Sequence, residues 1–290
     1  MNTPSTTSIT ADAGGMPKIC LSSVDGAQAE IYLYGAHITS WVPAGGEERL
    51  FLSQKSEFRP GAAIRGGVPV IFPQFGGLGT LPKHGFARTL PWDLSSLGGD
   101  PGSSTAEFYL ADSETTRSLW PHPFQANMNV SVGGTQLRLD FSILNTGSSP
   151  FSFTAALHTY LRVENILNTT IDGLHGLRFH DTVNRATPAD WVEMEQIPPQ
   201  VNFPGEVDRI YYDVPGPLKV IEPGRITTIL TEEFTDAVIW NPGPVRAARL
   251  VDMEADGYTR MVCVEAAIVG TSVTLDPGEA WHGTQLLSAD

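Results

Sequence analysis

The amino-acid sequence predicts an all-β fold, a large antiparallel β-sandwich built from two packed sheets. Short segments of alternating or continuous apolar character recur along the 290 residues, and clusters of Gly, Pro, Asn, Asp and Ser separate them. Helical periodicity is nearly absent, and 29 glycines with 22 prolines suit a chain with many turns. No segment repeats with a period of about 20 to 50 residues, which disfavours a propeller or a solenoid. Two packed antiparallel sheets are therefore the expected architecture.

The individual strands are predicted by short apolar or alternating runs between turn residues. We expect strands within residues 29–42, 104–113, 151–163, 237–242 and 261–270. A hairpin is expected over residues 128–144, where two alternating runs meet at Gly133 and Gly134. No Ser/Gly-rich linker divides the middle of the chain. Residues 17–290 are therefore predicted to be one domain, preceded by a short flexible tail, residues 1–16.

The composition limits the classes of partner. The formal net charge of −14 argues against nucleic acid or an anionic membrane as the main partner. No apolar stretch approaches the roughly 20 residues that span a bilayer, and the N-terminus lacks the basic and apolar regions of a signal peptide. Cys20 and Cys263 lie far apart in no metal-ligand spacing, so a reducing compartment is expected. These observations predict a cytoplasmic protein that does not bind membranes.

Two expected strands each place one ionisable side chain in a weakly polar setting. Glu265 interrupts the run MVCVEAAIVG, and His158 lies near the middle of FSFTAALHTYLRV. Each could be structural: Glu265 on an edge strand facing water, or as a buried carboxylate held by a structural partner. A carboxylate is costly to bury unpaired, and small residues beside both groups leave space for a ligand. Together they are a complementary acid–base pair for proton transfer, although the sequence separation does not say whether they meet.

Cationic residues gather in two neighbouring segments. Arg65 precedes a glycine pair in AIRGGVPVIFPQFG, where the backbone can approach a ligand closely. Lys83, His84 and Arg88 follow in LPKHGFARTLPW. Such a segment is usually solvated surface, but in an acidic protein it favours an anion site, because arginine suits phosphate geometry. By contrast, GEVDRIYYD, which contains Asp208, is typical of a turn with a local Asp–Arg ion pair.

Known metal and nucleophile motifs are missing. The acidic run at Asp252, Glu254 and Asp256 lacks calcium-loop spacing, and neither zinc-protease motifs nor a GxSxG nucleophile elbow occurs. Nucleotide-binding glycine loops are absent as well. We therefore expect no metal. The remaining histidines cannot be assigned from the sequence: His37, His122, His175, His180 and His282.

Taken together, the motifs resemble one family, the hexose-6-phosphate mutarotases or glucose-6-phosphate 1-epimerases, within the aldose 1-epimerase superfamily. The matching segments run in the family's order from residue 63 to the end of the chain: AIRGGVPVIFPQFG, LPKHGFARTLPW, LWPHPF, ALHTYLRV, VDRIY, VIWNP, MVCVEAA and LDPGEAWHGTQLLS. The combination of AIRGG, HGFAR and LHTY is much more specific than any single motif. The resemblance implies a β-sandwich of the galactose-mutarotase type, in agreement with the fold expected from the strand pattern.

The resemblance also implies roles for individual residues. His158 would be the general acid and Glu265 the general base of a cofactor-free ring opening. Arg65 and Arg88 would contact the substrate, including its phosphate. Lys83 stands where some members carry glutamine, and a lysine there suits a sugar phosphate. Asp208 would bond sugar hydroxyls, and His84 would line the same site.

Two alternatives stay open at this point, and no protein partner is indicated. One is a 1-epimerase for neutral sugars, against which Arg65, Lys83 and Arg88 argue. The other is a sugar-binding or regulatory sandwich without catalysis, for which an acid–base pair is unnecessary. A glycoside hydrolase is less suitable, because those enzymes usually pair two carboxylates.

Overall fold

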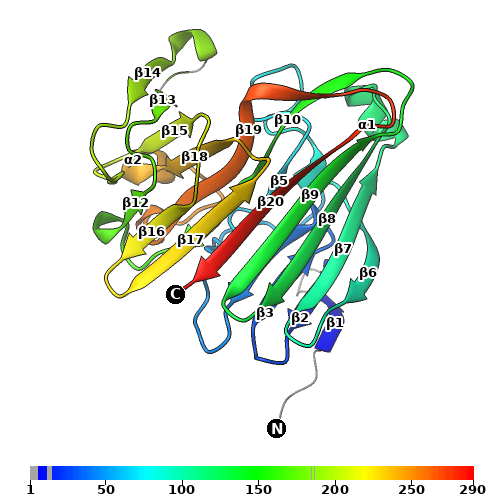
Figure 1. Cartoon of the computed structure of the whole chain (residues 1–290), viewed down its shortest axis with the longest axis horizontal. Helices are drawn as coiled ribbons and strands as arrows, with labels where there is room; N and C mark the ends of the chain where they lie inside the picture. Colours follow the sequence, from blue (N-terminus) through cyan, green and yellow to red (C-terminus); the bar gives the residue numbers. More distant parts are fainter. Residues whose placement is uncertain (1–5, 12–14, 184, 186) are drawn as a thin grey trace.

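The computed structural model describes residues 6–11, 15–183, 185 and 187–290, and it confirms the all-β prediction. The described strands form three antiparallel sheets, two of eight strands and one of four (Figure 1). Helices are short: α1 (Glu114–Leu119), α2 (Gly243–Ala247) and the 3-10 turns η1 (Ala87–Thr89), η2 (Ile166–Asn168), η3 (Pro188–Asp190) and η4 (Gly257–Arg260). Among the described residues, no helix has both the length and the apolar character to span a membrane.

Each sheet is named here after one of its members. The β19 sheet has the order β14 (Val192–Glu195), β13 (Arg178–Asp181), β15 (Val207–Tyr211), β18 (Asp236–Asn241), β19 (Met261–Leu275), β10 (Phe151–Leu157) and β5 (Val70–Ile71), and β11 (Tyr160–Arg162) also pairs with β19. The β9 sheet has the order β12 (Thr170–Asp172), β16 (Leu218–Glu222), β17 (Arg225–Glu232), β20 (Ala280–Ala289), β9 (Gln136–Asn145), β8 (Phe124–Gly133), β7 (Ser104–Ala111) and β6 (Asp93–Gly98). The N-terminal sheet is β1 (Thr6–Ala11), β2 (Pro17–Ser22), β3 (Gln28–Tyr32) and β4 (His37–Val42).

Alternation along the strands creates the core. The expected hairpin is β8 and β9, in which Gly133 pairs with Gln136 across a turn containing Gly134 at φ 56°. Every second residue of β8 is buried, as a strand with one face on the core requires. One apolar cluster joins Met128 of the β9 sheet to Val264 of the β19 sheet. The main core therefore lies between the faces of the two large sheets, which is the sandwich arrangement.

The segment predicted as one strand over residues 151–163 is interrupted at His158. β10 ends at Leu157 and β11 begins at Tyr160. Between them the Thr159 N–H donates to the Leu157 carbonyl at 2.9 Å, which kinks the strand locally. The pairing register survives this break: Leu157 lies opposite Ala266, and Tyr160 lies opposite Cys263. His158 is thereby placed opposite Glu265 on the same face of the sheet, about 5 Å apart at Cβ for such cross-strand neighbours.

The prediction that the segment GEVDRIYYD forms a turn with a local ion pair is wrong. It contains strand β15, in which Asp208 lies opposite Trp240. Successive side chains of a strand point to opposite faces, so the side chains of Asp208 and Arg209 lie on opposite faces of the sheet and do not form an ion pair. Arg209 instead donates to Gln196 at 3.2 Å. A strand in the middle of a sheet can therefore present Asp208 to a ligand.

The division of the chain at residue 16 stays a prediction. Within the expected tail, β1 (Thr6–Ala11) pairs antiparallel with β2, so this stretch has regular structure. Its sequence, TTSITA, is rich in β-branched residues, which favour strands. Residues 1–5 and 12–14 lie outside the described residues.

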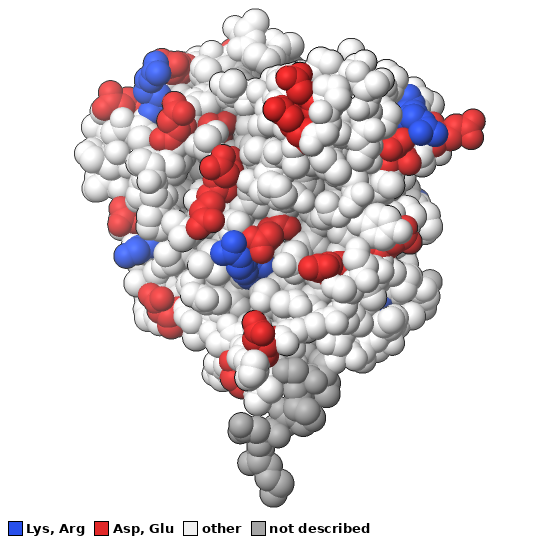
Figure 2. All heavy atoms as spheres, turned by 45° about the vertical axis from the view of Figure 1, so that its right-hand side comes forward, with Lys and Arg blue, Asp and Glu red and all other residues white. Residues whose placement is uncertain are grey.

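The surface shown in Figure 2 carries acidic and basic side chains dispersed among large uncharged areas. On this face the acidic groups are spread widely, as expected for a chain with a net charge of −14. Local concentrations of positive charge on such a protein are therefore informative, because the overall field opposes the approach of an anion.

Candidate active site

All seven residues singled out in the sequence line one pocket of about 590 Å³. Ligand pockets commonly measure roughly 300–1,000 Å³. The pocket opens over the β19 sheet and receives side chains from the loop between β4 and β6, from the break at His158, from β15 and from β19. The seven residues are Arg65, Lys83, His84, Arg88, His158, Asp208 and Glu265.

Other hollows of similar size occur on the described part of the chain, with volumes of about 460, 520 and 630 Å³. Size alone therefore does not identify the site. The pocket over the β19 sheet is distinguished by a buried imidazole and a buried carboxylate in direct contact. Ionisable groups with shifted pKa values in a cleft are typical of functional sites.

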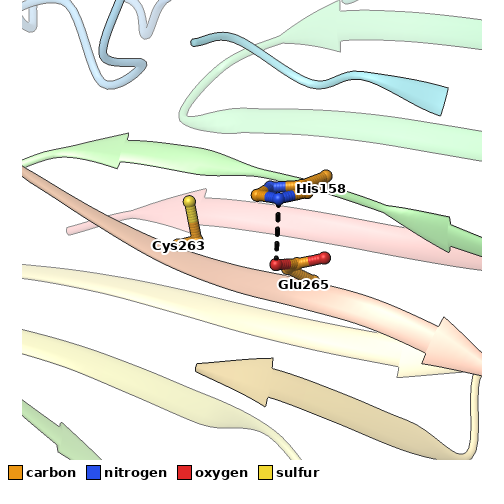
Figure 3. Close-up of side chains that lie close together, drawn as sticks. All are labelled: His158, Cys263 and Glu265. Atoms are coloured by element: carbon orange, nitrogen blue, oxygen red, sulfur yellow. Dashed lines mark ion pairs between the residues drawn. The ribbon is translucent and has the colours of Figure 1, made fainter. Parts of the chain in front are cut away.

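His158 and Glu265 form the centre of this pocket. The His158 Nε2 atom lies 3.3 Å from Glu265 Oε1, and both side chains project from the same face of the sheet (Figure 3). Glu265 is 2% exposed and His158 is 8% exposed. Among the described residues, His158 Nδ1 and Glu265 Oε2 have no hydrogen-bond partner. Buried polar atoms are normally bonded, so a ligand with hydroxyl groups would suit this pair.

Burial shifts both groups toward their neutral forms. Desolvation raises the pKa of Glu265 well above 4.5, and the nearby Asp208 carboxylate adds to this, while Lys83 and Arg88 oppose it. Desolvation also lowers the pKa of His158 well below 6.5, and Arg88 and Arg65 lower it further. Both shifts favour the uncharged forms, protonated Glu265 and neutral His158, and the 3.3 Å contact lets a proton pass between the two groups.

Aromatic rings fix the orientation of His158. Tyr160 stacks on the imidazole with ring centroids 4.8 Å apart and 10° between planes, and Trp240 meets it edge-on at 6.0 Å. His84 approaches at 5.6 Å in a T-shaped arrangement. Since the Gly76 N–H donates to His84 Nδ1 at 3.2 Å, the hydrogen of neutral His84 is placed on Nε2. His84 therefore lines the site, as expected from the sequence.

Arg65 is held rigidly by residues distant in sequence. Its Nε and Nη2 atoms donate to Asp252 Oδ2 at 3.1 and 2.9 Å, and Nη1 donates to the Tyr160 hydroxyl at 2.9 Å. Sequence reasoning missed Asp252 and Tyr160 as partners of Arg65. The acidic run around Asp252 was considered in the sequence only as a calcium loop, whose spacing it lacks. Arg65 thus acts as a fixed positive charge with most of its donors already used.

The glycine pair after Arg65 explains why the loop can pack so closely. Gly66 and Gly67 have φ values of 120° and 61°, and a Cβ atom on Gly67 would overlap the Ile38 carbonyl. His37, which could not be assigned from the sequence, contacts the Gly66 carbonyl at 2.7 Å through Nε2. Burial lowers the pKa of His37 to about 4, so His37 is neutral and donates to this carbonyl near neutral pH.

Two further arginines add to the positive charge of the pocket, Arg185 and Arg246. The sequence contained no signal for either, since both lie outside the motif segments. Arg246 pairs with Glu206 at 2.8 Å and Arg88 donates to the Lys83 carbonyl at 3.1 Å. Within the described residues, Lys83 forms no ion pair with an acidic side chain. A multivalent anion would therefore meet cations with free donors.

Asp208 faces this group of cations from β15. Burial raises the pKa of Asp208 above 3.8, while Thr182, Arg246 and Lys83 lower it. A carboxylate that is partly dry and faces a pocket can accept hydrogen bonds from ligand hydroxyls.

A metal site at the centre of the pocket is disfavoured by its donor set. His158, Cys263 and Glu265 have ligand atoms within 4.8 Å of one another (Figure 3). However, burial raises the pKa of the Cys263 thiol well above 9, and only the thiolate is a good ligand. Cys263 packs in an apolar cluster with Met261 and Trp240. It is therefore a core residue beside the pair.

The sequence is similar to known proteins along most of its length. A family model described as "Aldose 1-epimerase" matches residues 17–288. A protein of Cenchrus ciliaris named "Putative glucose-6-phosphate 1-epimerase" is 37% identical over 285 residues, which cover 95% of this chain and 85% of that protein. A protein of Escherichia coli with the same name is 40% identical over 245 residues, 83% of this chain and 79% of that protein.

The fold is shared with solved structures. The crystal structure of a "putative mutarotase" from Salmonella typhimurium superimposes with a TM-score of 0.89 at 32% identity, covering 100% of this chain and 95% of that one. A galactose mutarotase-like protein from Clostridium acetobutylicum, at 15% identity and covering 98% of each chain, has a TM-score of 0.78, a likeness of fold alone.

Proposed function

The chain belongs to the aldose 1-epimerase family, and we propose that it interconverts the α and β anomers of a hexose 6-phosphate, with glucose 6-phosphate as the first candidate. The observation that carries this proposal is the His158–Glu265 contact of 3.3 Å inside a pocket that five cationic side chains line. An acid–base pair suits the opening of a hemiacetal, and the cations suit a phosphate. Relatives named for glucose 6-phosphate support the same substrate.

The reaction needs one proton acceptor and one proton donor. Glu265 as the carboxylate removes the proton from the anomeric O1 hydroxyl, while His158 as the imidazolium protonates the ring oxygen. The C1–O5 bond then breaks, and the sugar becomes the open-chain aldehyde. After rotation about C1–C2, the groups exchange roles: His158 takes back the proton from the O5 hydroxyl, and Glu265 protonates O1. No net proton is gained or lost, and a cofactor is unnecessary.

The acid–base pair His158 and Glu265 meets this requirement for one donor and one acceptor. The reactive form, carboxylate plus imidazolium, carries the same single proton as the neutral form that burial favours. It arises when the proton moves from Glu265 to His158 across their contact. Acid and base whose environments shift their pKa values toward each other can both act near neutral pH.

The substrate phosphate is assigned to Arg88 and Lys83, with Arg65 adding charge. Arg65 already uses most of its donors to bond Asp252 and Tyr160. Arg88 has Nε buried without a partner among the described residues, so it has donors to offer. Asp208 would accept hydrogen bonds from sugar hydroxyls, and His84 would bond the sugar through Nε2–H.

Exchange spectroscopy by NMR on glucose 6-phosphate tests the proposal, with free glucose as the parallel substrate. We expect the protein to accelerate anomer exchange of glucose 6-phosphate strongly and of glucose weakly. Equal acceleration of both sugars would favour the alternative, a 1-epimerase for neutral sugars. Acceleration of neither would leave a sugar-binding sandwich without catalysis.

The phosphate assignment predicts a selective defect for Arg88→Ala. Removing a charge-assisted hydrogen bond should lower kcat/KM for glucose 6-phosphate by about 10- to 100-fold, while residual activity on glucose changes little. Arg138→Ala is a matched control, because Arg138 lies on β9 in a different hollow. An equal loss on both sugars for Arg88→Ala would remove its phosphate role.

We also propose that residues 17–290 act as one domain in the cytoplasm. The main core cluster draws on residues from Ile19 to Ala289, which supports a single unit. Two free cysteines, one of them buried, suit a reducing compartment.

A further inference from the structure

Gln285 is a polar side chain in the middle of an apolar core. It lies on β20 and is 0% exposed. Its Oε1 atom accepts a hydrogen bond from Thr159 Oγ1 at 2.6 Å, and its Nε2 atom donates to the Val264 carbonyl at 3.4 Å. An amide buried between two sheets is costly unless both ends are bonded. Gln285 thus links the β9 sheet to the β19 sheet at one point of the core.

That point lies directly beneath the proposed acid–base pair. Thr159 follows His158 in the chain, and Val264 precedes Glu265. Thr159 and Val264 face the core, while His158 and Glu265 face the pocket, because neighbours in a strand alternate. Gln285 therefore contacts the residues adjacent to both reactive groups without touching the pocket.

The amide also replaces a missing bond of the sheet. The Val264 N–H donates to the Thr159 carbonyl at 3.1 Å, so an intact antiparallel pair would also have the Thr159 N–H donate to the Val264 carbonyl. Instead the Thr159 N–H turns to Leu157 at the break. Gln285 Nε2 bonds the Val264 carbonyl in its place.

We propose that Gln285 and Thr159 are positioning residues that keep His158 and Glu265 at their working separation. The side-chain bridge stabilises the break at His158 and sets the distance between the two strands where ladder hydrogen bonds are lost. This inference rests on the proposed function for its meaning, since it assigns how the acid–base pair is held. Neither Gln285 nor Thr159 lines the pocket.

The test uses apolar variants of similar shape, Gln285→Met and Thr159→Val. A displacement of the reacting groups by a fraction of an ångström lowers the chemical step, so we expect kcat for anomer exchange to fall about tenfold or more while KM changes less than about twofold. Thr159→Ser keeps the hydroxyl and should retain near-parental kcat. The pH–rate profile should shift in Gln285→Met and Thr159→Val only.

A matched control separates positioning from general stability. Asn145 is another fully buried amide, which donates to the carbonyls of Ser149 and Leu275 at 3.0 and 2.9 Å, away from the pocket. Asn145→Leu should lower the thermal unfolding midpoint but leave kcat and the pH profile unchanged at temperatures where it is folded. If kcat follows stability in the same way for all variants, or if Gln285→Met and Thr159→Val keep the parental kcat and pH profile, the inference is overturned.

A measurement that does not depend on activity tests the bridge even if the proposed function is wrong. The imidazole resonances of His158 report its titration in NMR spectra. We expect the His158 titration to differ between the parent protein and Thr159→Val, and to agree between the parent and Thr159→Ser. Inactivity of the parent protein would refute the proposed reaction, whereas an unchanged His158 titration in Thr159→Val would refute the bridge.

Discussion

Glu265→Gln is expected to lower kcat for anomer exchange of glucose 6-phosphate by about 10²–10⁴-fold, the usual contribution of a positioned proton acceptor. Glutamine keeps the size of the side chain but cannot accept the O1 proton. KM should change little, because the substrate's phosphate and hydroxyl contacts remain. NMR exchange at saturating substrate measures the effect. A variant with near-parental kcat would remove Glu265 from the mechanism.

The same substitution should not destabilise the fold at pH 7. Since burial raises the pKa of Glu265 in the folded state, the folded protein retains a proton that the unfolded chain releases above about pH 4.5. The stability contribution of this group is present at lower pH and is lost as pH rises toward the raised pKa. Glutamine stays neutral, so Glu265→Gln should be at least as stable as the parent at pH 7.

Glu222→Gln is the matched control for this prediction. Glu222 is also a buried glutamate, but it accepts a hydrogen bond from the Glu164 N–H at 2.6 Å and faces Arg225 at 3.7 Å, remote from the pocket. Its replacement should lower the thermal unfolding midpoint and spare kcat. Loss of activity in Glu265→Gln together with loss of stability in Glu222→Gln would show that the two glutamates serve catalysis and folding, respectively.

Local patterns predicted the sandwich and one face of the site because they depend on neighbouring residues. Alternation in MVCVEAAIVG places Val262 and Val264 in the main core and Cys263 with Glu265 on the opposite face, as the structure shows. The hairpin at Gly134 was predicted for the same reason, since a short turn between alternating runs is encoded within a few residues.

Contacts between distant segments could not be predicted in this way. Arg65 bonds Asp252, which is 187 residues away, and no local feature of either segment indicates the other. The break at His158 was not predicted either, because the backbone hydrogen bond from Thr159 to Leu157 that accompanies it leaves no trace in the apolar pattern of FSFTAALHTYLRV. The sequence alone could nominate His158 and Glu265 as a pair, but only the retained register across the break places them opposite each other.

His158→Asn is the second substitution with a large expected effect. Asparagine cannot donate a proton to the ring oxygen, so kcat should fall by about 10²–10⁴-fold. In the parent, activity requires that His158 and Glu265 together hold one proton. Because the pKa of His158 is lowered below 6.5, the acid limb of the parent kcat/KM profile should lie below pH 6.5, where a second proton enters the pair. His158→Asn should lose this limb, which pH-dependent NMR exchange can measure.

Stability measurements complete the test of His158, because its pKa is shifted down whereas that of Glu265 is shifted up, so the two groups affect stability in opposite directions as pH changes. A lowered pKa means that the unfolded chain binds a proton below about pH 6.5 while the folded protein does not, so this group destabilises the fold as pH falls. His158→Asn should therefore lose less stability between pH 7 and pH 5 than the parent does. His122→Asn, the same substitution at a half-buried histidine beside Trp120 and outside the pocket, should keep the parental kcat and the parental acid limb. A His158→Asn variant that retained that limb would assign the titration to another group and remove His158 as the acid.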